Sequence, residues 1–222
     1  MRYAALAAVL LFTGCASFRS PPAETAPAPA AEAPKAEAPK AEPADGAVAR
    51  IEFASTSATK NGAVVNDTKY SEKPDDAQIL EKKYENGVAT YTGQLGFGKG
   101  SAWAGFGFGV SFAGDAKPVD LTKAQTITFK LASATTRSLR LRITGPETAI
   151  QNAGCYPIVM QPVTPDLTDY EIPIAKFAPE GWCGANARTI QQTAPQAVGI
   201  EVVDIAYQRA PSTFSVGTIV AK

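Results

Sequence analysis

Histidine is absent from this chain of 222 residues, and cysteine occurs only three times. The lack of histidine excludes Ser-His-Asp and Cys-His catalysis and removes the commonest general base near neutral pH. It also leaves too few nitrogen and sulfur ligands for a zinc site. A phosphate-binding loop is missing as well, because the glycine-rich stretch 96–100 lacks the Lys-Ser/Thr ending of such loops. We therefore expect no cofactor.

Neither sign of charge is in excess, since 21 basic residues balance 21 acidic residues. A nucleic-acid partner would require a concentrated basic face, so we expect none. The same balance argues against strong electrostatic steering toward any highly charged partner.

The apolar stretch near the N-terminus, Ala4 to Phe12, is too short for a permanent membrane helix, which needs about 20 residues. Arg2 before it and small residues after it are typical of an export signal, which we place at residues 1–14. The sequence LFTGC, ending at Cys15, resembles the lipobox of bacterial lipoproteins. In such proteins the signal is cut before the cysteine, and the cysteine is then acylated.

This resemblance implies a location. Two or more acyl chains, such as palmitate, would hold Cys15 on a membrane almost permanently, at about 0.8 kcal/mol per buried methylene. Ala16 follows the cysteine, and in such lipoproteins a residue other than Asp at this position implies sorting to the outer membrane. The resemblance therefore predicts a lipid anchor in the outer membrane of a bacterial envelope. The alternative is an ordinary secretory signal with an incidental cysteine.

The segment 15–46 begins with this cysteine and then consists mainly of Ala, Pro, Glu and Lys, including the near repeat AEAPKAEAPKAEP. One proline per repeat and hardly any apolar bulk prevent it from forming a helix or a core. We predict a disordered linker that tethers the next domain. A specific role as a proline-rich ligand is the alternative.

Residues 47–222 are numerous enough for one domain with a sizeable core, and their residue choice is that of an all-β protein. No stretch offers a convincing helix. Asn86-Gly87 joins two of the expected strands and favours a type I′ hairpin turn. The expected strands are 48–53, 78–84, 88–94, 103–112, 126–131, 138–143, 156–161, 170–174, 199–207 and 214–220. Many short alternating strands predict two packed antiparallel sheets, a β-sandwich or jelly roll.

If Cys15 carries lipid, Cys155 and Cys183 remain as an even pair in an exported domain, and we predict that they form a disulfide. The bridge would join two glycine-flanked loops, each with one large aromatic residue beside the cysteine, Tyr156 and Trp182.

Acidic residues could still be catalytic, because two carboxyl groups several ångström apart in a cleft can hydrolyse glycosides. Glu201 and Asp204 are three positions apart in an expected strand and therefore point to opposite faces. The other acidic residues considered, Glu147, Asp166, Asp169 and Glu180, lie in or beside loops, where solvated carboxylates are the rule. We expect no enzyme.

The region from Trp103 onward resembles the galactose-binding-domain-like jelly rolls, and within them certain carbohydrate-binding modules. The resemblance is carried by WAGFGFGVSF, PVDLTKAQTITFKL, LRLRI, DLTDYEIPIAKF, AVGIEVVDI and the terminal FSVGTIV. It implies a jelly roll whose last strand returns beside the first. Members often hold a structural calcium with acidic residues of the last strand, but this strand reads Ser215-Val216-Gly217-Thr218-Ile219. Only Glu52 and Asp204 remain as candidate carboxylates for the six to eight oxygen ligands that calcium prefers, so the sequence leaves it open whether this structural calcium is bound.

The stretch AGFGFGVSF, residues 104–112, has a large apolar residue at every second position and glycine between them. In the first interpretation, aromatic side chains of neighbouring strands or a covering loop lie over Gly105, Gly107 and Gly109, while the large residues pack inward. In the second, the glycines floor a shallow groove on the outer face of the sheet, and basic side chains beside it donate hydrogen bonds to a glycan.

The candidate donors are Arg140, Arg142 and Lys130, and the candidate aromatic platforms are Trp182, Tyr156 and Trp103. Each has an alternative structural role. The arginines would be a solvated outer face, Trp103 would pack in the core or at an edge, and Tyr156 and Trp182 would shield the disulfide.

The expected function is a non-catalytic module that binds polysaccharide or envelope glycan. The alternative is a structural domain or one that binds a surface protein. An exposed aromatic pair beside donors in a groove would favour sugar, and a broad apolar patch above roughly 600 Å² would favour a protein.

Overall fold

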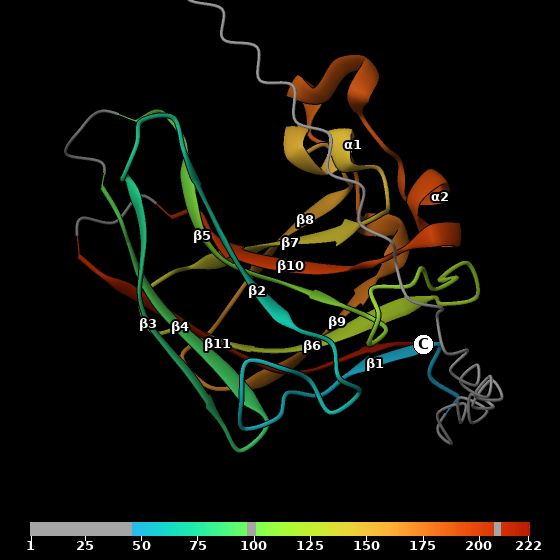
Figure 1. Cartoon of the computed structure of the whole chain (residues 1–222), viewed down its shortest axis with the longest axis horizontal. Helices are drawn as coiled ribbons and strands as arrows, with labels where there is room; N and C mark the ends of the chain where they lie inside the picture. Colours follow the sequence, from blue (N-terminus) through green and yellow to red (C-terminus); the bar gives the residue numbers. More distant parts are fainter. Residues whose placement is uncertain (1–45, 97–100, 207–209) are drawn as a thin grey trace, which may run out of the picture. The chain divides into compact units, whose positions relative to one another are not determined.

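The computed structural model describes residues 46–96, 101–206 and 210–222, in which the strands form two antiparallel sheets packed face to face (Figure 1). The predicted signal peptide, Cys15 and the linker as far as residue 45 lie outside the described residues. Within them, no helix combines the length and the apolar character that a membrane span requires.

Sheet 1 has six strands in the order β3-β4-β11-β6-β9, and β1 also pairs with β11. Its strands are β1 (Ala49–Ile51), β3 (Ala77–Glu85), β4 (Val88–Leu95), β6 (Thr126–Ala132), β9 (Thr168–Pro173) and β11 (Ser212–Ala221). The pairing of β1 with β11 brings the last strand beside the first, as the jelly-roll resemblance implies.

Sheet 2 has five strands in the order β2-β5-β10-β7-β8. Its strands are β2 (Val65–Ser71), β5 (Ala104–Ser111), β7 (Ser138–Thr144), β8 (Ile158–Pro162) and β10 (Gly199–Asp204). Every strand pairing in both sheets is antiparallel. The all-β sandwich predicted from the sequence is therefore confirmed.

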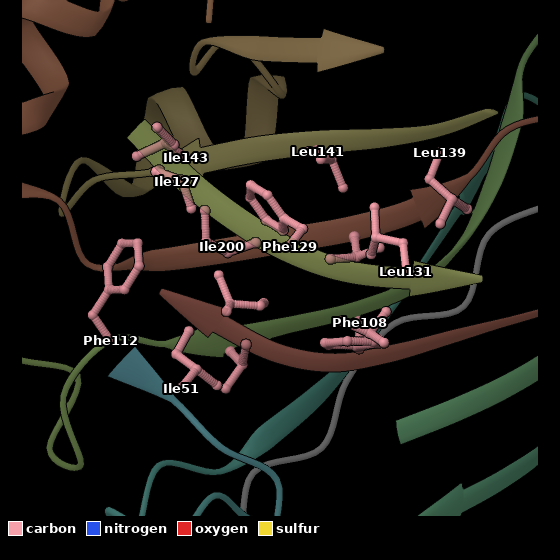
Figure 2. Close-up of a cluster of buried hydrophobic side chains, with 14 of the residues drawn as sticks. Ile51, Phe108, Phe112, Ile127, Phe129, Leu131, Leu139, Leu141, Ile143 and Ile200 are labelled. Carbon is pink, nitrogen blue, oxygen red and sulfur yellow. The ribbon is translucent and has the colours of Figure 1, made fainter. Parts of the chain in front are cut away.

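The core lies between the sheets and is filled by the apolar residues that alternate along the strands (Figure 2). From β6 come Ile127, Phe129 and Leu131, and β7 contributes a matching row on the opposite sheet. The large residues of the AGFGFGVSF stretch also point inward, where the Phe108 ring contacts Tyr91 with ring centroids 4.9 Å apart. Alternation with period two therefore positions the core, as the sequence predicted.

The hairpin between β3 and β4 turns at Asn86 and Gly87, whose φ angles are 53° and 78°. Both residues thus take the left-handed conformation that the Asn-Gly prediction requires.

The structure differs from the prediction in two respects. The edge strand β2, with the sequence VNDTKYS, was not among the expected strands because it shows no apolar alternation. Two short helices also occur, α1 (Thr148–Ala153) and α2 (Ile190–Thr193), where no helix was expected. They are too short to show a helical period. Short 3₁₀ segments complete the elements, η2 (Ile174–Lys176), η3 (Gly181–Asn186) and η4 (Ala194–Gln196).

Candidate functional site

A cleft of about 900 Å³ lies on the outer face of sheet 2. Strands β2, β5, β7 and β10 contribute to it, together with the loop before β5, the end of α1 and the segment around η3. Figure 1 shows α1 beside the β7–β8 side of this sheet. The lining residues are Thr68, Tyr70, Ala102, Trp103, Ala104, Arg140, Arg142, Gln151, Asn152, Ala153, Gly154, Glu180, Trp182, Glu201 and Ile205.

The glycines of β5 face this outer side, and their surroundings differ along the strand. Over Gly105 lies the ring of Tyr70, so close that a Cβ there would overlap it. At Gly107 the backbone of Val202 leaves no room for a Cβ. A Cβ at Gly109, in contrast, would meet only ordinary contacts, 3.4 Å from Glu201 Cγ and 3.8 Å from Thr68 Oγ1.

An aromatic cover, as in the first interpretation, is thus present over Gly105. The second interpretation fails in its floor, because none of Gly105, Gly107 and Gly109 lines the cleft. Tyr70 and Thr68 come from β2, which pairs with β5 at these positions.

Arg140 and Arg142 project from β7 to the outer side, as the alternation predicted, but they are buried and not solvated. Arg142 Nη1 donates to Glu201 Oε2 at 2.7 Å, and Gln151 Nε2 donates to the other oxygen of Glu201 at 2.6 Å. The interpretation of these arginines as a solvated sheet surface is therefore wrong. Pairing with carboxylates compensates the cost of removing each guanidinium from water.

Arg140 is held by different partners. Its Nη2 donates to the Tyr70 hydroxyl, and its guanidinium carbon lies 5.1 Å from the centroid of the Tyr70 ring. Burial raises the pKa of the Tyr70 phenol, so that the oxygen accepts this bond in the neutral form. The Nε atoms of Arg140 and Arg142 are buried without a hydrogen-bond partner. Unsatisfied donors in a cleft wall are unusual and favour a polar ligand.

The two tryptophans of the cleft are strongly exposed. Trp103 is 52% exposed, and its ring centroid lies 6.1 Å from that of Tyr70. Trp182 is 65% exposed and lies in η3 beside Cys183. The cleft thus combines apolar rings at its surface with polar groups at its base.

No family model matches the chain, and neither does any curated protein. A family 11 carbohydrate-binding module from Clostridium thermocellum, solved with a β-1,3-1,4-mixed-linked tetrasaccharide, is similar with 13% identity and a TM-score of 0.50. The similarity covers 79% of this chain and 96% of that module. A family 30 module of a cellulosomal cellulase from the same organism has 12% identity and a TM-score of 0.46, covering 78% of this chain and 96% of the module.

The domain has the jelly-roll fold of carbohydrate-binding modules. This likeness concerns the fold, because the sequences share few residues.

Within this jelly roll, the predicted disulfide between Cys155 and Cys183 is present, with the Cα atoms 5.6 Å apart. It forms a small apolar cluster with Ile150 of α1 and with Tyr156. The cluster joins α1 to the η3 segment, which carries Trp182.

Tyr156 itself was expected as an aromatic platform, and this prediction is wrong. The side chain is only 1% exposed, and its hydroxyl oxygen accepts a hydrogen bond of 2.7 Å from the Glu147 backbone N–H. Tyr156 has the structural role that was its alternative, because the ring packs in the disulfide cluster and cannot contact a ligand.

Lys130 was expected beside the same groove, and this prediction is also wrong. It lies on β6 of sheet 1, where it contacts Asp169 at 3.8 Å. It lines a separate depression of about 390 Å³ next to Gly217. Alternation places Lys130 on an outer face, but it does not tell which of the two sheets carries the strand.

Four predicted site residues thus line one cleft, namely Trp103, Arg140, Arg142 and Trp182. Sequence reasoning missed Tyr70, Glu180 and Glu201 as members of this site. The only available signal was the proximity of Glu180 to Trp182 in the sequence, since Tyr70 lies in the unrecognised strand β2.

Two acidic residues, Glu180 and Glu201, also line the cleft, whereas Asp204 points into the core and is fully buried. This confirms the opposite orientation of Glu201 and Asp204. Asp204 accepts hydrogen bonds from Ser212 Oγ at 2.6 Å and Thr136 Oγ1 at 3.1 Å. Among the described residues, no group of three or more His, Cys, Asp or Glu side chains is arranged to hold a metal ion.

Proposed function

We propose that the domain is a non-catalytic module that binds a carbohydrate chain in the cleft of sheet 2. The observation that carries the proposal is the pairing of two strongly exposed tryptophans, Trp103 and Trp182, with buried arginines that have unpartnered Nε donors. The ligand classes we favour are an envelope glycan and an external polysaccharide.

Sugar chemistry matches both parts of this arrangement. The C–H faces of a pyranose pack on aromatic rings, and its hydroxyl groups both donate and accept hydrogen bonds. In the cleft, Trp103 and Trp182 offer the rings, whereas Arg140, Arg142 and Glu180 offer donors and an acceptor. The similarity in fold to modules named for carbohydrate binding supports the same assignment.

Binding without catalysis is favoured by the state of the buried acid. Both oxygens of Glu201 already accept hydrogen bonds, one from Arg142 and one from Gln151. A carboxylate whose two oxygens are already engaged is less available as the acid or nucleophile that glycoside hydrolysis requires.

The test is titration of the purified protein with a panel of soluble polysaccharides by affinity electrophoresis and calorimetry. Trp182→Ala and Trp103→Ala should each weaken binding at least about tenfold, the loss expected for an aromatic residue at the centre of a binding site. Both side chains are exposed, so the variants should keep their thermal stability. Leu80→Ala is the control, because Leu80 is half exposed on β3 of sheet 1.

Unchanged binding in both tryptophan variants would refute the site. If no glycan bound the wild-type protein, the alternative of a structural or protein-binding surface domain would replace the proposal.

We further propose that the protein is a lipoprotein of the bacterial outer membrane, anchored through acylated Cys15 and carrying the domain on the proline-rich segment. The support is the LFTGC sequence followed by Ala16.

A further inference from the structure

The charged residues of the cleft balance in number but differ in exposure. Its charged lining residues are two arginines, Arg140 and Arg142, and two glutamates, Glu180 and Glu201. The side chains of Arg140, Arg142 and Glu201 are 9%, 6% and 9% exposed, whereas that of Glu180 is 21% exposed. A ligand that enters the cleft therefore meets the negative charge of Glu180 before the buried positive charges.

Glu180 is also the more loosely paired of the two acids. Its Oε2 lies 3.5 Å from Arg140 Nη1 and 3.8 Å from Arg142 Nη2, whereas Glu201 is held by Arg142 at 2.7 Å. Contacts near 3.5 Å are too long for strong hydrogen bonds. The oxygens of Glu180 consequently retain capacity to accept hydrogen bonds from a ligand.

These two features determine which ligands the cleft accepts. Hydroxyl groups of an uncharged sugar can donate to Glu180 and can accept from the arginines beneath it. A carboxylate or sulfate on the sugar would lose its water and be placed next to the exposed negative charge. Repulsion by this exposed charge a few ångström away, offset only in part by the more deeply buried Arg140 and Arg142, should cost at least about a tenfold loss of affinity.

We infer that Glu180 is a specificity-determining residue, which accepts hydrogen bonds from hydroxyl groups of uncharged glycans and excludes glycans that carry acidic groups. The inference rests on the proposed function of the cleft and assigns a chemical class to its ligand. A domain with this residue selects among envelope and external polysaccharides by their charge.

The test compares wild-type protein, Glu180→Gln and Glu147→Gln by calorimetry at low and high salt. Glutamine keeps the shape and one accepting oxygen, but it removes the charge and replaces the other oxygen by a donating NH2 group. Glu147 makes an exposed ion pair with Arg188 and does not line the cleft, so Glu147→Gln controls for the change in net charge. The neutral ligands are mixed-linkage β-glucan, xylan and galactomannan, and the acidic ligands are polygalacturonate, alginate and hyaluronate.

We expect wild-type protein and Glu147→Gln to bind at least one neutral glycan and to bind the acidic glycans at least about tenfold more weakly. Glu180→Gln should weaken neutral binding by up to about tenfold, because an amide oxygen accepts a weaker hydrogen bond than a carboxylate, and should show a gain of at least about tenfold in the ratio of acidic to neutral affinity. That gain should diminish at high salt, because it is electrostatic.

Neutral binding with an unchanged preference in Glu180→Gln would overturn the inference and leave the proposed function standing. Equal or stronger binding of acidic glycans by wild-type protein would overturn the inference in the same way. Binding of neither class by any of the proteins would overturn the proposed function, and with it the inference that rests on it.

Discussion

Alanine substitutions at the glycines of β5 should have graded effects on stability, because each added methyl group meets different surroundings. At Gly107 the methyl group would overlap the carbonyl oxygen of Val202, a backbone atom that cannot rotate away. At Gly105 it would overlap the ring of Tyr70, which can move. At Gly109 it would make contacts of ordinary length.

The magnitudes follow from these contacts. Gly107→Ala requires β5 and β10 to separate, which should cost about 3 kcal/mol or more of the free energy of unfolding. Gly105→Ala should cost about 1–2 kcal/mol as Tyr70 shifts. Gly109→Ala should stabilise the protein by about 0.5 kcal/mol, because alanine loses less conformational entropy than glycine on folding.

Urea unfolding followed by fluorescence is the assay. With a slope near 3 kcal/mol/M, at the upper end for small proteins, Gly107→Ala should lower the midpoint by about 1 M, whereas Gly109→Ala should raise it slightly. Gly105→Ala should in addition weaken glycan binding, because Tyr70 accepts a hydrogen bond from Arg140. Equal midpoints for Gly107→Ala and Gly109→Ala would refute the reasoning from close backbone approach.

Three further predictions concern other parts of the chain. Reduction of the Cys155–Cys183 disulfide, which spans 28 positions, should lower the free energy of unfolding by about 3.5 kcal/mol in denaturant titration. It should also weaken glycan binding through Trp182. Unchanged stability after reduction would contradict this prediction. Burial raises the pKa of Asp204, so the native state binds this proton more tightly than the unfolded state. Wild-type protein should therefore lose stability relative to Asp204→Asn as pH rises above about 4, and a difference in free energy of unfolding that stays constant from pH 4 to 7 would count against it. Cys15→Ser should move the protein from the membrane fraction of expressing bacteria to the soluble fraction and abolish labelling with palmitate, whereas retention in the membrane would exclude the lipid anchor.

The sequence predicted most of the fold because the inward-facing rows are strongly patterned. In β6, Ile127, Phe129 and Leu131 alternate with polar residues, and a strand of this kind has only one orientation that buries its apolar side. Asn86-Gly87 predicted its hairpin for an equally local reason, since both residues tolerate positive φ. Strand β2 was not predicted, because an edge strand with mostly exposed residues carries no such pattern.

The site was harder to predict, since it depends on which strands become neighbours. The alternation along the strands predicted that Arg140 and Lys130 point to outer faces. Only the order of strands in the sheets shows that Arg140 lies in the cleft and Lys130 on the opposite sheet. Tyr156 and Trp182 looked alike in the sequence, each beside a cysteine. In the structure Tyr156 is buried in the cluster with Ile150 of α1, whereas Trp182 is exposed. Such outcomes depend on contacts distant in sequence, which no local pattern encodes.

The two faces of sheet 2 differ in role, because the inner face contributes to stability and the outer face to the proposed ligand binding. On its inner side, Phe106 and Phe108 pack in the core, and a change there would cost several kcal/mol. On its outer side, buried arginines are compensated by carboxylates, and an ion pair of this kind contributes little net stability compared with apolar residues of the same volume. These charged side chains contribute little to stability, and they line a cleft beside exposed rings. Their role is therefore best explained by ligand binding, because they hold donors and an acceptor in place for a ligand. Replacing Arg142 and Glu201 together by Met and Leu should therefore abolish glycan binding while leaving the free energy of unfolding nearly unchanged.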